Sequence, residues 1–213
     1  AGNIPGSHIE GRAYAVGGSY GNKTGMKTIT TYGMLLAKAT RRPMPEDLAK
    51  QLPVSKEIAE LMGLHVLTAA GFEADDILGT LSRIAKENDV ECVIVTGDRD
   101  SYQLVCDGVT VHLAANNETR IIDTKAIDEM YGLTPSQLID LKAVMGDSSD
   151  NISGVPGIGE KGALELMHQY GSLDGIYAHI DEIKGSKKTK LENGRKDAYM
   201  SRFLAEISKS APV

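Results

Sequence analysis

Acidic side chains gather in three short segments, each at a point where a strand is expected to end or a helix to begin. The seven carboxylates belong to Glu73, Asp75, Asp76, Asp98, Asp100, Asp147 and Asp150. If they meet in the fold, they repel one another and their pKa values rise unless cations are bound among them. Mg²⁺ and Mn²⁺ prefer oxygen ligands, whereas the five histidines and two cysteines show no zinc-type spacing. The pattern therefore favours a magnesium or manganese site.

Two such ions would have a defined chemistry. Held roughly 3.5 to 4 Å apart, they can generate a hydroxide and stabilise the attacking and leaving oxygens of a phosphodiester. This reading predicts hydrolysis of nucleic acid. A simpler explanation competes with it, because acids at the start of a helix also cap the helix and complement its dipole. Capping explains one or two of these residues, but not seven in three groups.

A glycine-rich turn lies between two predicted helices. It consists of Gly154, Val155, Pro156, Gly157, Ile158 and Gly159, and Lys161 follows it. Glycine allows close approach of the backbone, the start of the next helix presents free amide groups, and the lysine adds a positive charge. Most such loops are ordinary turns, but this pattern is the helix-hairpin-helix signature. It predicts sequence-independent contact with the phosphates of a duplex.

The net charge of −6 is unusual for a protein that binds nucleic acid. The positive charges are, however, segregated. Lys38, Arg41 and Arg42 form one basic group, and residues 184–196 contain six cations against one anion. Such a run is often only a solvated helix face, and that alternative stays open.

Hydrophobic periodicity predicts the elements that position these groups. The run Val90–Thr96 is nearly all β-branched and suits a strand buried in a parallel sheet, so Asp98 would follow its carboxyl end. A helix is expected over residues 73–88, short strands over 64–67, 109–113 and 120–122, and a helix from Pro45. Further helices are predicted over residues 28–38, 124–130, 135–145, 160–170, 173–178 and 195–207.

These elements predict an α/β fold with a mostly parallel central sheet flanked by helices, followed by a helical unit that contains the hairpin. We expect an α/β nuclease core over residues 13–146 and a helical DNA-binding subdomain over 147–213. Residues 1–12 end in IEGR, a processing-protease site, and are interpreted as a tag remnant. Neither a bilayer-spanning run nor a secretory leader is evident, so the cytoplasm is the expected compartment.

Three runs carry a family resemblance: GFEADDILGTLS, VIVTGDRDSYQLV, and the stretch from YGLTPSQLIDLKAVMGDSSDN to GVPGIGEKGALELMHQYGSLDGIY. They resemble the 5′ nuclease domain of bacterial DNA polymerase I, in the flap endonuclease superfamily, from about Arg41 onward. The resemblance implies that Glu73, Asp75, Asp76 and Asp98 lie nearest one catalytic metal ion and that Asp100, Asp147 and Asp150 complete a second set. It also implies that residues 154–161 clamp the duplex, often with a monovalent cation such as K⁺. Lys38, Arg41 and Arg42 resemble the basic segment that engages the 5′ strand.

The sequence also departs from the family. Members begin with a strand ending in Ile-Asp-Gly, whereas the nearest counterpart here is Ile4-Pro5-Gly6. A second strand ending in Phe-Asp, and the basic arch after it, have no counterpart. Either the natural polypeptide contains segments that this sequence lacks, or the chain is a divergent homologue without two metal ligands. The first is favoured, because a central parallel strand is hard to delete without losing the fold.

The expected activity is a structure-selective 5′-3′ exonuclease or 5′ flap endonuclease that uses two or more Mg²⁺ or Mn²⁺ ions in primer removal and repair. Its partners would be DNA with a 5′ flap or a 5′ end at a junction, and RNA primer–DNA hybrids. We expect a monomer without membrane association. A catalytically inactive DNA-junction binding homologue is the alternative.

Overall fold

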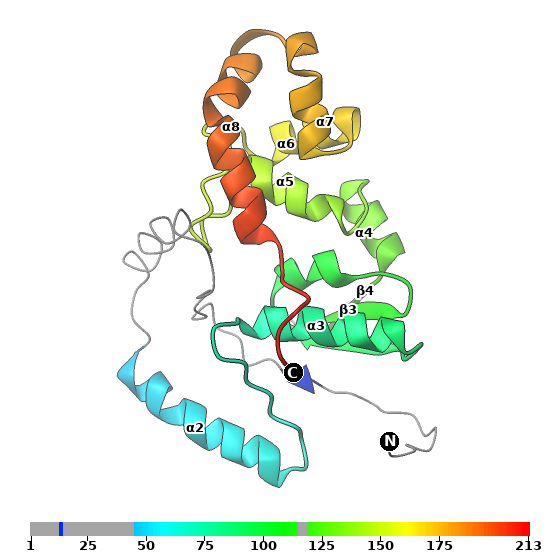
Figure 1. The fold of residues 1–213 in the computed structure, drawn as a ribbon, viewed down its shortest axis with the longest axis vertical. Coiled ribbons are helices and arrows are strands. Elements are labelled where there is room, and N and C mark those ends of the chain that lie inside the picture. Colours follow the sequence, from blue (N-terminus) through cyan, green and yellow to red (C-terminus); the bar gives the residue numbers. More distant parts are fainter. Residues whose placement is uncertain (1–12, 15–44, 115–118) are drawn as a thin grey trace.

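The fold is seen in a computed structural model, which describes residues 13–14, 45–114 and 119–213, with only the backbone for the first pair. A small sheet with adjoining helices forms one end of the molecule, and a group of five helices forms the other (Figure 1). The predicted helix over residues 28–38 and the predicted tag remnant lie outside the described residues. Within these residues, none of the helices combines the length and apolar character needed to cross a bilayer.

Four strands pair in the order β1-β2-β3-β4. They are β1 (Ala13–Tyr14), β2 (Cys92–Thr96), β3 (Val109–Ala114) and β4 (Thr119–Ile122). The first three are parallel, whereas β4 runs antiparallel to β3. Ile94 pairs with Val111, and both are almost fully buried at 1% and 0% exposure. The predicted mostly parallel sheet is confirmed, although β1 was not predicted.

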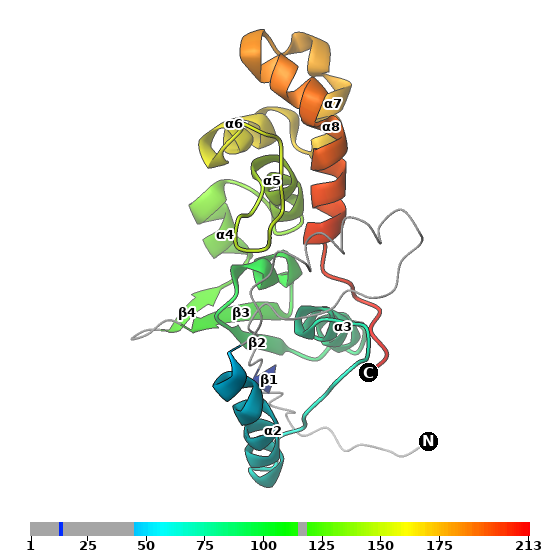
Figure 2. The same ribbon diagram turned by 90° about the vertical axis from the view of Figure 1, so that its left-hand side faces the viewer.

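Helices α2 (Glu46–Leu61) and α3 (Ala74–Glu87) belong to the α/β end of the fold. Helix α3 packs beside β2 and buries Leu78 against the sheet. Helix α2 lies apart from the other described helices in both views (Figures 1 and 2), and none of its residues is buried. The predicted strand over residues 64–67 is wrong: the segment has no regular structure and pairs with no strand in the described part of the chain.

Five helices lie at the other end of the molecule; the last four build the core of the second unit, whereas the first buries Ile127 in the sheet core. They are α4 (Thr124–Tyr131), α5 (Gln137–Met145), α6 (Glu160–Tyr170), α7 (Leu173–Ala178) and α8 (Gly185–Ala205). Their core includes Val144, Leu173 and Leu191, each 0% exposed. The contact between α5 and α8 is the most extensive helix–helix contact of this unit. The partly buried Leu138 of α5 packs against both this core and the sheet core, so α5 joins the two units.

Helix α8 begins about ten residues earlier than predicted. The early turns are rich in lysine and lack an apolar stripe, so periodicity did not reveal them. Tertiary contacts hold them instead. Leu191 is fully buried, and the Tyr177 hydroxyl donates a hydrogen bond to its carbonyl at 3.0 Å. At Gly194 the helix backbone approaches the glycine-rich turn so closely that a Cβ would lie 2.9 Å from Val155 Cγ1.

Replacing Gly194 by alanine is expected to destabilise the protein by about 1 kcal/mol, because the clash with Val155 outweighs the higher helix propensity of alanine. Chemical denaturation measures this change. Gly162→Ala is the matched control, since its Cβ would meet Ile158 at an ordinary 3.4 Å. A Gly194→Ala protein as stable as the Gly162→Ala protein contradicts the close packing of α8.

Candidate functional site

The first acidic group lies at the start of α3. Glu73 is the N-cap residue, and Asp75 and Asp76 occupy the first turn. The carboxylate of Asp75 is half-buried, and within the described residues it accepts no hydrogen bond. Burial, and then the negative charges of Asp98, Asp100, Glu73 and Asp76, raise the pKa of Asp75 to about 6. This helix start therefore faces the second acidic group.

The second group follows β2, as the strand prediction required. The chain leaves the sheet at Thr96, whose hydroxyl accepts a hydrogen bond from the Asp98 amide at 3.0 Å. Asp98 then caps the short 3-10 helix η1 (Arg99–Leu104) by accepting from the Asp100 amide at 2.9 Å. These two bonds fix both aspartates at the carboxyl edge of the sheet. Ligands of open parallel sheets collect at this edge.

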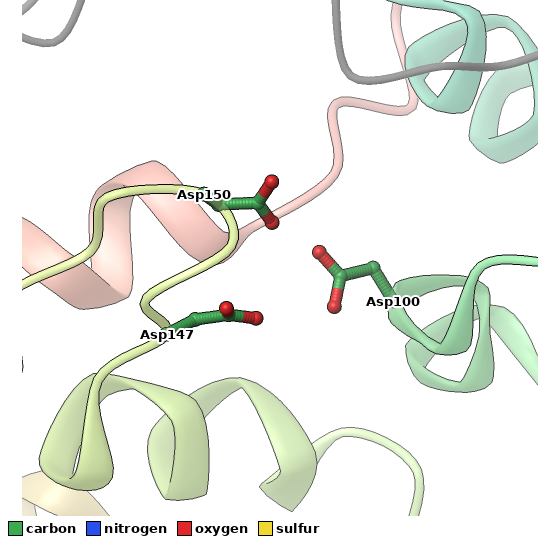
Figure 3. Close-up of side chains that lie close together, drawn as sticks. All are labelled: Asp100, Asp147 and Asp150. Atoms are coloured by element: carbon green, nitrogen blue, oxygen red, sulfur yellow. The ribbon is translucent and has the colours of Figure 1, made fainter. Parts of the chain in front are cut away.

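The third group joins the second around a lysine that the sequence analysis missed. Asp100, Asp147 and Asp150 point toward one another (Figure 3), and each offers an oxygen within 4.8 Å of the others. The ammonium group of Lys142 lies among them, 2.5 Å from Asp100, 2.8 Å from Asp147 and 3.0 Å from Asp150. Lys142 is only 7% exposed. The sequence feature that could have indicated this role is a single lysine within the mostly apolar helix sequence LIDLKAVM.

The loop after α5 holds Asp147 and Asp150 in place. Asp147 and Ile152 form an antiparallel bridge, with amide-to-carbonyl distances of 2.8 and 2.7 Å. Gly146 and Gly154 close the loop with φ angles of 76° and 60°. A Cβ on Gly154 would lie 2.3 Å from the Gly146 nitrogen, so only glycine fits there.

Lys142 determines the electrostatics of this cluster. Burial lowers the pKa of Lys142, but Asp100, Asp147 and Asp150 outweigh it, so the ammonium is more strongly protonated than usual. Burial alone would raise the pKa of the Asp147 carboxyl, but hydrogen bonds from Lys142 and Ser149 lower this pKa to about 2. For Asp100, burial and the nearby Asp98 and Asp150 raise the pKa in spite of Lys142. One lysine thus compensates three carboxylates incompletely.

Oxygen ligands converging from three segments fit hard divalent ions. The structure brings together Asp75, Asp98 and Asp100, and it places Asp147 and Asp150 beside Asp100. Asp76 has a different environment. It is 3% exposed, and its two oxygens accept hydrogen bonds from backbone amides of Glu73 and Ser208.

The predicted glycine-rich turn is built on α5 and α8. Its Gly154 amide donates to the Ser201 hydroxyl at 3.0 Å, and the Val155 amide donates to the Val144 carbonyl at 2.8 Å. The side chains of Val155 and Ile158 are buried in the helical core, at 1% and 6% exposure. The exposed residues of this segment are Pro156, Gly157, Gly159, Glu160 and Lys161. Gly159 caps the start of α6.

The six cations of residues 184–196 have unequal surroundings. Lys187 and Lys188 pair with Glu165 and Asp181 at 2.8 and 2.7 Å. Lys190 donates to the Gly157 carbonyl at 3.0 Å, which ties α8 to the turn. The guanidinium of Arg195 stacks on the Tyr177 ring, 5.0 Å from its centre. Lys184 and Lys196 are exposed. Lys38, Arg41 and Arg42 lie outside the described residues.

Two family models match consecutive parts of the chain. Residues 36–132 match the 5′-3′ exonuclease, N-terminal resolvase-like domain, and residues 133–213 match the 5′-3′ exonuclease, C-terminal SAM fold. The chain belongs to the 5′-3′ exonuclease family. The predicted resemblance is confirmed, and so is the class of enzyme, a nuclease. The family's helical fold also agrees with the predicted carboxyl-terminal unit.

Among curated relatives, this member of the 5′-3′ exonuclease family is 43% identical over 179 residues to DNA polymerase I of Bacillus caldotenax. It is 42% identical over 176 residues to the thermostable DNA polymerase I of Thermus thermophilus. The matches cover 83% of the chain in both cases but only 20% and 21% of the relatives. The chain thus spans about a fifth of the length of these polymerases.

Solved structures agree on the fold. The T5 5′-exonuclease with bound divalent zinc ions superposes with a TM-score of 0.66 at 24% identity, over 83% of this chain and 66% of that one. The catalytic core of Rad2 in complex with DNA substrate gives a TM-score of 0.53 at 21% identity, over 83% and 62%. Both likenesses support the mixed α/β fold found here.

The raised pKa of Asp75 predicts a pH-dependent gain from Asp75→Asn in metal-free protein. The pKa of Asp75 is about 6 in the folded state against an ordinary 3.8, so the ionised carboxylate destabilises the folded state. The whole of this destabilisation is present only above about pH 6. We expect the variant to be about 2 kcal/mol more stable at pH 7.5, with the gain fading as the pH falls from 6 to 4. Denaturation with a chelator present measures it. Asp128→Asn on the exposed face of α4 is the control, and equal pH profiles of both variants would exclude the proposed repulsion.

Lys142→Met leaves the three carboxylates of Asp100, Asp147 and Asp150 without their cation. The metal-free variant should lose about 2 kcal/mol at pH 7.5, because removing one partner of a buried ion pair leaves charge uncompensated. Saturating Mg²⁺ should restore most of that loss. Thermal unfolding with and without Mg²⁺ checks both points. Lys125→Met, at an exposed pair with Glu129, serves as control. Undiminished stability without Mg²⁺ would show that the ammonium is not needed.

Proposed function

We propose that the chain is a structure-selective 5′-3′ exonuclease and 5′ flap endonuclease that hydrolyses DNA phosphodiesters with two Mg²⁺ or Mn²⁺ ions. The observation that carries the proposal is the convergence of acids from α3, from the end of β2 and from the loop after α5. Membership of the 5′-3′ exonuclease family supports the reaction class. The likeness to a metal-bound T5 exonuclease supports a metal centre.

The residues divide into two sets by position. Glu73, Asp75 and Asp98 would hold one ion, and Asp100, Asp147 and Asp150 would hold another. Bound divalent ions supply Lewis-acid activation of the scissile phosphate. The half-buried carboxylates orient the ions, and the raised pKa values of Asp75 and Asp100 make ion binding depend on pH near 6. Lys142 compensates part of the negative charge of the second set when that set holds no metal, and it would remain beside the phosphate as a positive charge.

DNA would be held by the other unit. The exposed residues Gly157 and Gly159 of the turn and the exposed Lys161 suit phosphate contacts through backbone amides and an ammonium group. The exposed Lys184 and Lys196 of the α8 region extend the positive surface. We also propose K⁺ at the carbonyls of this turn, and a role for Lys38, Arg41 and Arg42 in guiding the 5′ strand.

The proposed substrates are DNA with a 5′ flap or with a 5′ end at a junction, and RNA primer–DNA hybrids. The names of the relatives, DNA polymerase I, support a role beside DNA synthesis. We propose that the chain works as a monomer, on the chromosome in the cytoplasm. The α/β nuclease core would comprise residues 13–146 and the DNA-binding subdomain residues 147–213. Helix α5 contributes to the helical core, so the two units share this helix.

A second candidate is a DNA-junction binding homologue without activity. Two observations favour it: the sequence has no counterpart of the family's two Asp-bearing strand ends, and an ammonium group already lies among the second acid set. Such a protein would keep the hairpin and the basic surface but cleave nothing.

Cleavage of a 5′-flap DNA in Mg²⁺ distinguishes the two candidates. The unaltered chain should release short 5′ products, and Asp98→Ala should lower the rate roughly 100-fold or more. Binding of the same DNA in a chelator should be unchanged. Asp128→Ala removes an exposed carboxylate outside the three groups and should leave the rate unaltered. DNA binding without Mg²⁺-dependent product from the unaltered chain would favour the inactive binder.

A further inference from the structure

The last residue of α8, Ala205, and the residues that follow it as far as 211 lie along α3 and η1, and residues 206–211 form neither helix nor strand. Figure 1 shows this stretch descending from α8 beside α3. Ala205, Ile207 and Ala211 are buried, at 5%, 7% and 6% exposure. A buried segment without regular structure must find partners for its backbone elsewhere, because unpaired amides and carbonyls are costly. We call residues 205–211 the tail segment.

Side chains of α3 and η1 supply these partners. Gln103 makes two bonds: it donates to the Ala205 carbonyl at 2.9 Å and accepts from the Ile207 amide at 3.0 Å. The Thr80 hydroxyl accepts from the Ala211 amide at 2.8 Å, and Arg83 donates to the Lys209 carbonyl at 2.9 Å. The tail segment is therefore hydrogen-bonded to α3, which carries the first acidic group, and to η1, which carries Asp100 of the second.

Asp76 is the central member of this set. One of its oxygens accepts from the Ser208 amide at 2.8 Å, and the other accepts from the Glu73 amide at 3.0 Å. The second bond belongs to a capping box between Glu73 and Asp76. At 3% exposure, the carboxylate is enclosed by these backbone groups. The neighbouring carboxylate of Asp75, in contrast, is half-buried and accepts no hydrogen bond from the residues that the structure describes.

Packing brings the tail segment into direct contact with the helix backbone. A Cβ on Gly79 would lie 2.8 Å from Ile207 Cγ2 and 2.8 Å from the Ser208 carbonyl oxygen. Gly79 is one turn after Asp76, so the helix surface beside Asp76 is shaped to receive residues 207–208. The hydrogen bond and the close packing are two separate observations of one docked segment.

We propose that Asp76 is a positioning residue and not a metal ligand. It fastens the tail segment to the first turn of α3 and, through the capping box, sets the direction of Glu73 and Asp75. Gln103 joins the same segment to η1, which carries Asp98 and Asp100. The tail segment thereby holds the two halves of the first metal set at a constant separation. What it positions rests on the proposed function, whereas the docking itself does not.

The test compares Asp76→Asn, Asp75→Asn and Thr80→Val in the full chain. Hydrogen exchange of residues 205–211 reports docking, and electron paramagnetic resonance of added Mn²⁺ reports metal affinity. Asp76→Asn replaces one acceptor by a donor, so the tail amides should exchange at least about tenfold faster and Mn²⁺ should bind about tenfold more weakly. Thr80→Val, one helical turn after Asp76 and without a carboxylate that could bind metal, should change both readouts in the same direction. Asp75→Asn should weaken Mn²⁺ binding with the tail still protected.

The opposite pattern overturns the proposal. If Asp76 is a ligand, Asp76→Asn weakens Mn²⁺ binding as Asp75→Asn does, the tail amides stay protected, and Thr80→Val leaves Mn²⁺ affinity unchanged. Should Asp76→Asn fail to fold, Thr80→Val decides alone, because faster exchange of the tail without any change in Mn²⁺ affinity contradicts positioning. If the unaltered chain binds no Mn²⁺, the proposed function fails, while the exchange data still show whether Asp76 docks the tail.

Discussion

Repulsion among carboxylates is the constraint on which the arrangement of this protein depends. Asp75, Asp98, Asp100, Asp147 and Asp150 come from three segments and lie close enough to perturb one another. An isolated cluster of this kind would push the chain apart, since buried like charges cost several kcal/mol. The ammonium of Lys142 compensates part of this charge, and Asp75 pairs with no cation in the part of the chain that the structure describes. Metal binding would supply the missing positive charge, so that stability and activity draw on the same electrostatic interaction.

Rigid local structure keeps these charges together. Asp98 and Asp100 are fixed by a strand end and a 3-10 cap, and the glycine-closed loop fixes Asp147 and Asp150. Helix α5 carries Lys142 into the cluster and also anchors the glycine-rich turn through Val144. A single helix thus connects the candidate metal centre with the candidate phosphate-binding turn. In our account this connection sets the distance between the gripped duplex and the bond to be cut.

Much of this could be predicted from local sequence, and the rest depended on tertiary contacts. The β-branched run before Asp98 identified β2, and the helix at Glu160–Tyr170 was predicted with its observed bounds because Gly159 and Gly171 delimit it. The start of α8 was missed because its lysine-rich turns are held by Leu191 and Gly194 contacts. Asp75 and Asp76 have the same side chain at adjacent positions, but Asp76 is held by the local capping box with Glu73 and by the amide of Ser208, 132 residues along the chain. The role of Lys142 was missed because its side chain belongs to an otherwise apolar helix and because its partner Asp100 lies 42 residues away in the sequence.

A crystal structure of the chain soaked in Mn²⁺, with anomalous scattering to locate the ions, would show whether acids from the three segments form one cation-binding cage. We expect one ion bound by Asp75 and Asp98 and a second among Asp100, Asp147 and Asp150, with the Lys142 ammonium moved aside and Asp76 still bonded to Ser208. Manganese found only at scattered surface carboxylates, with no ion bound in the cluster, would contradict this expectation.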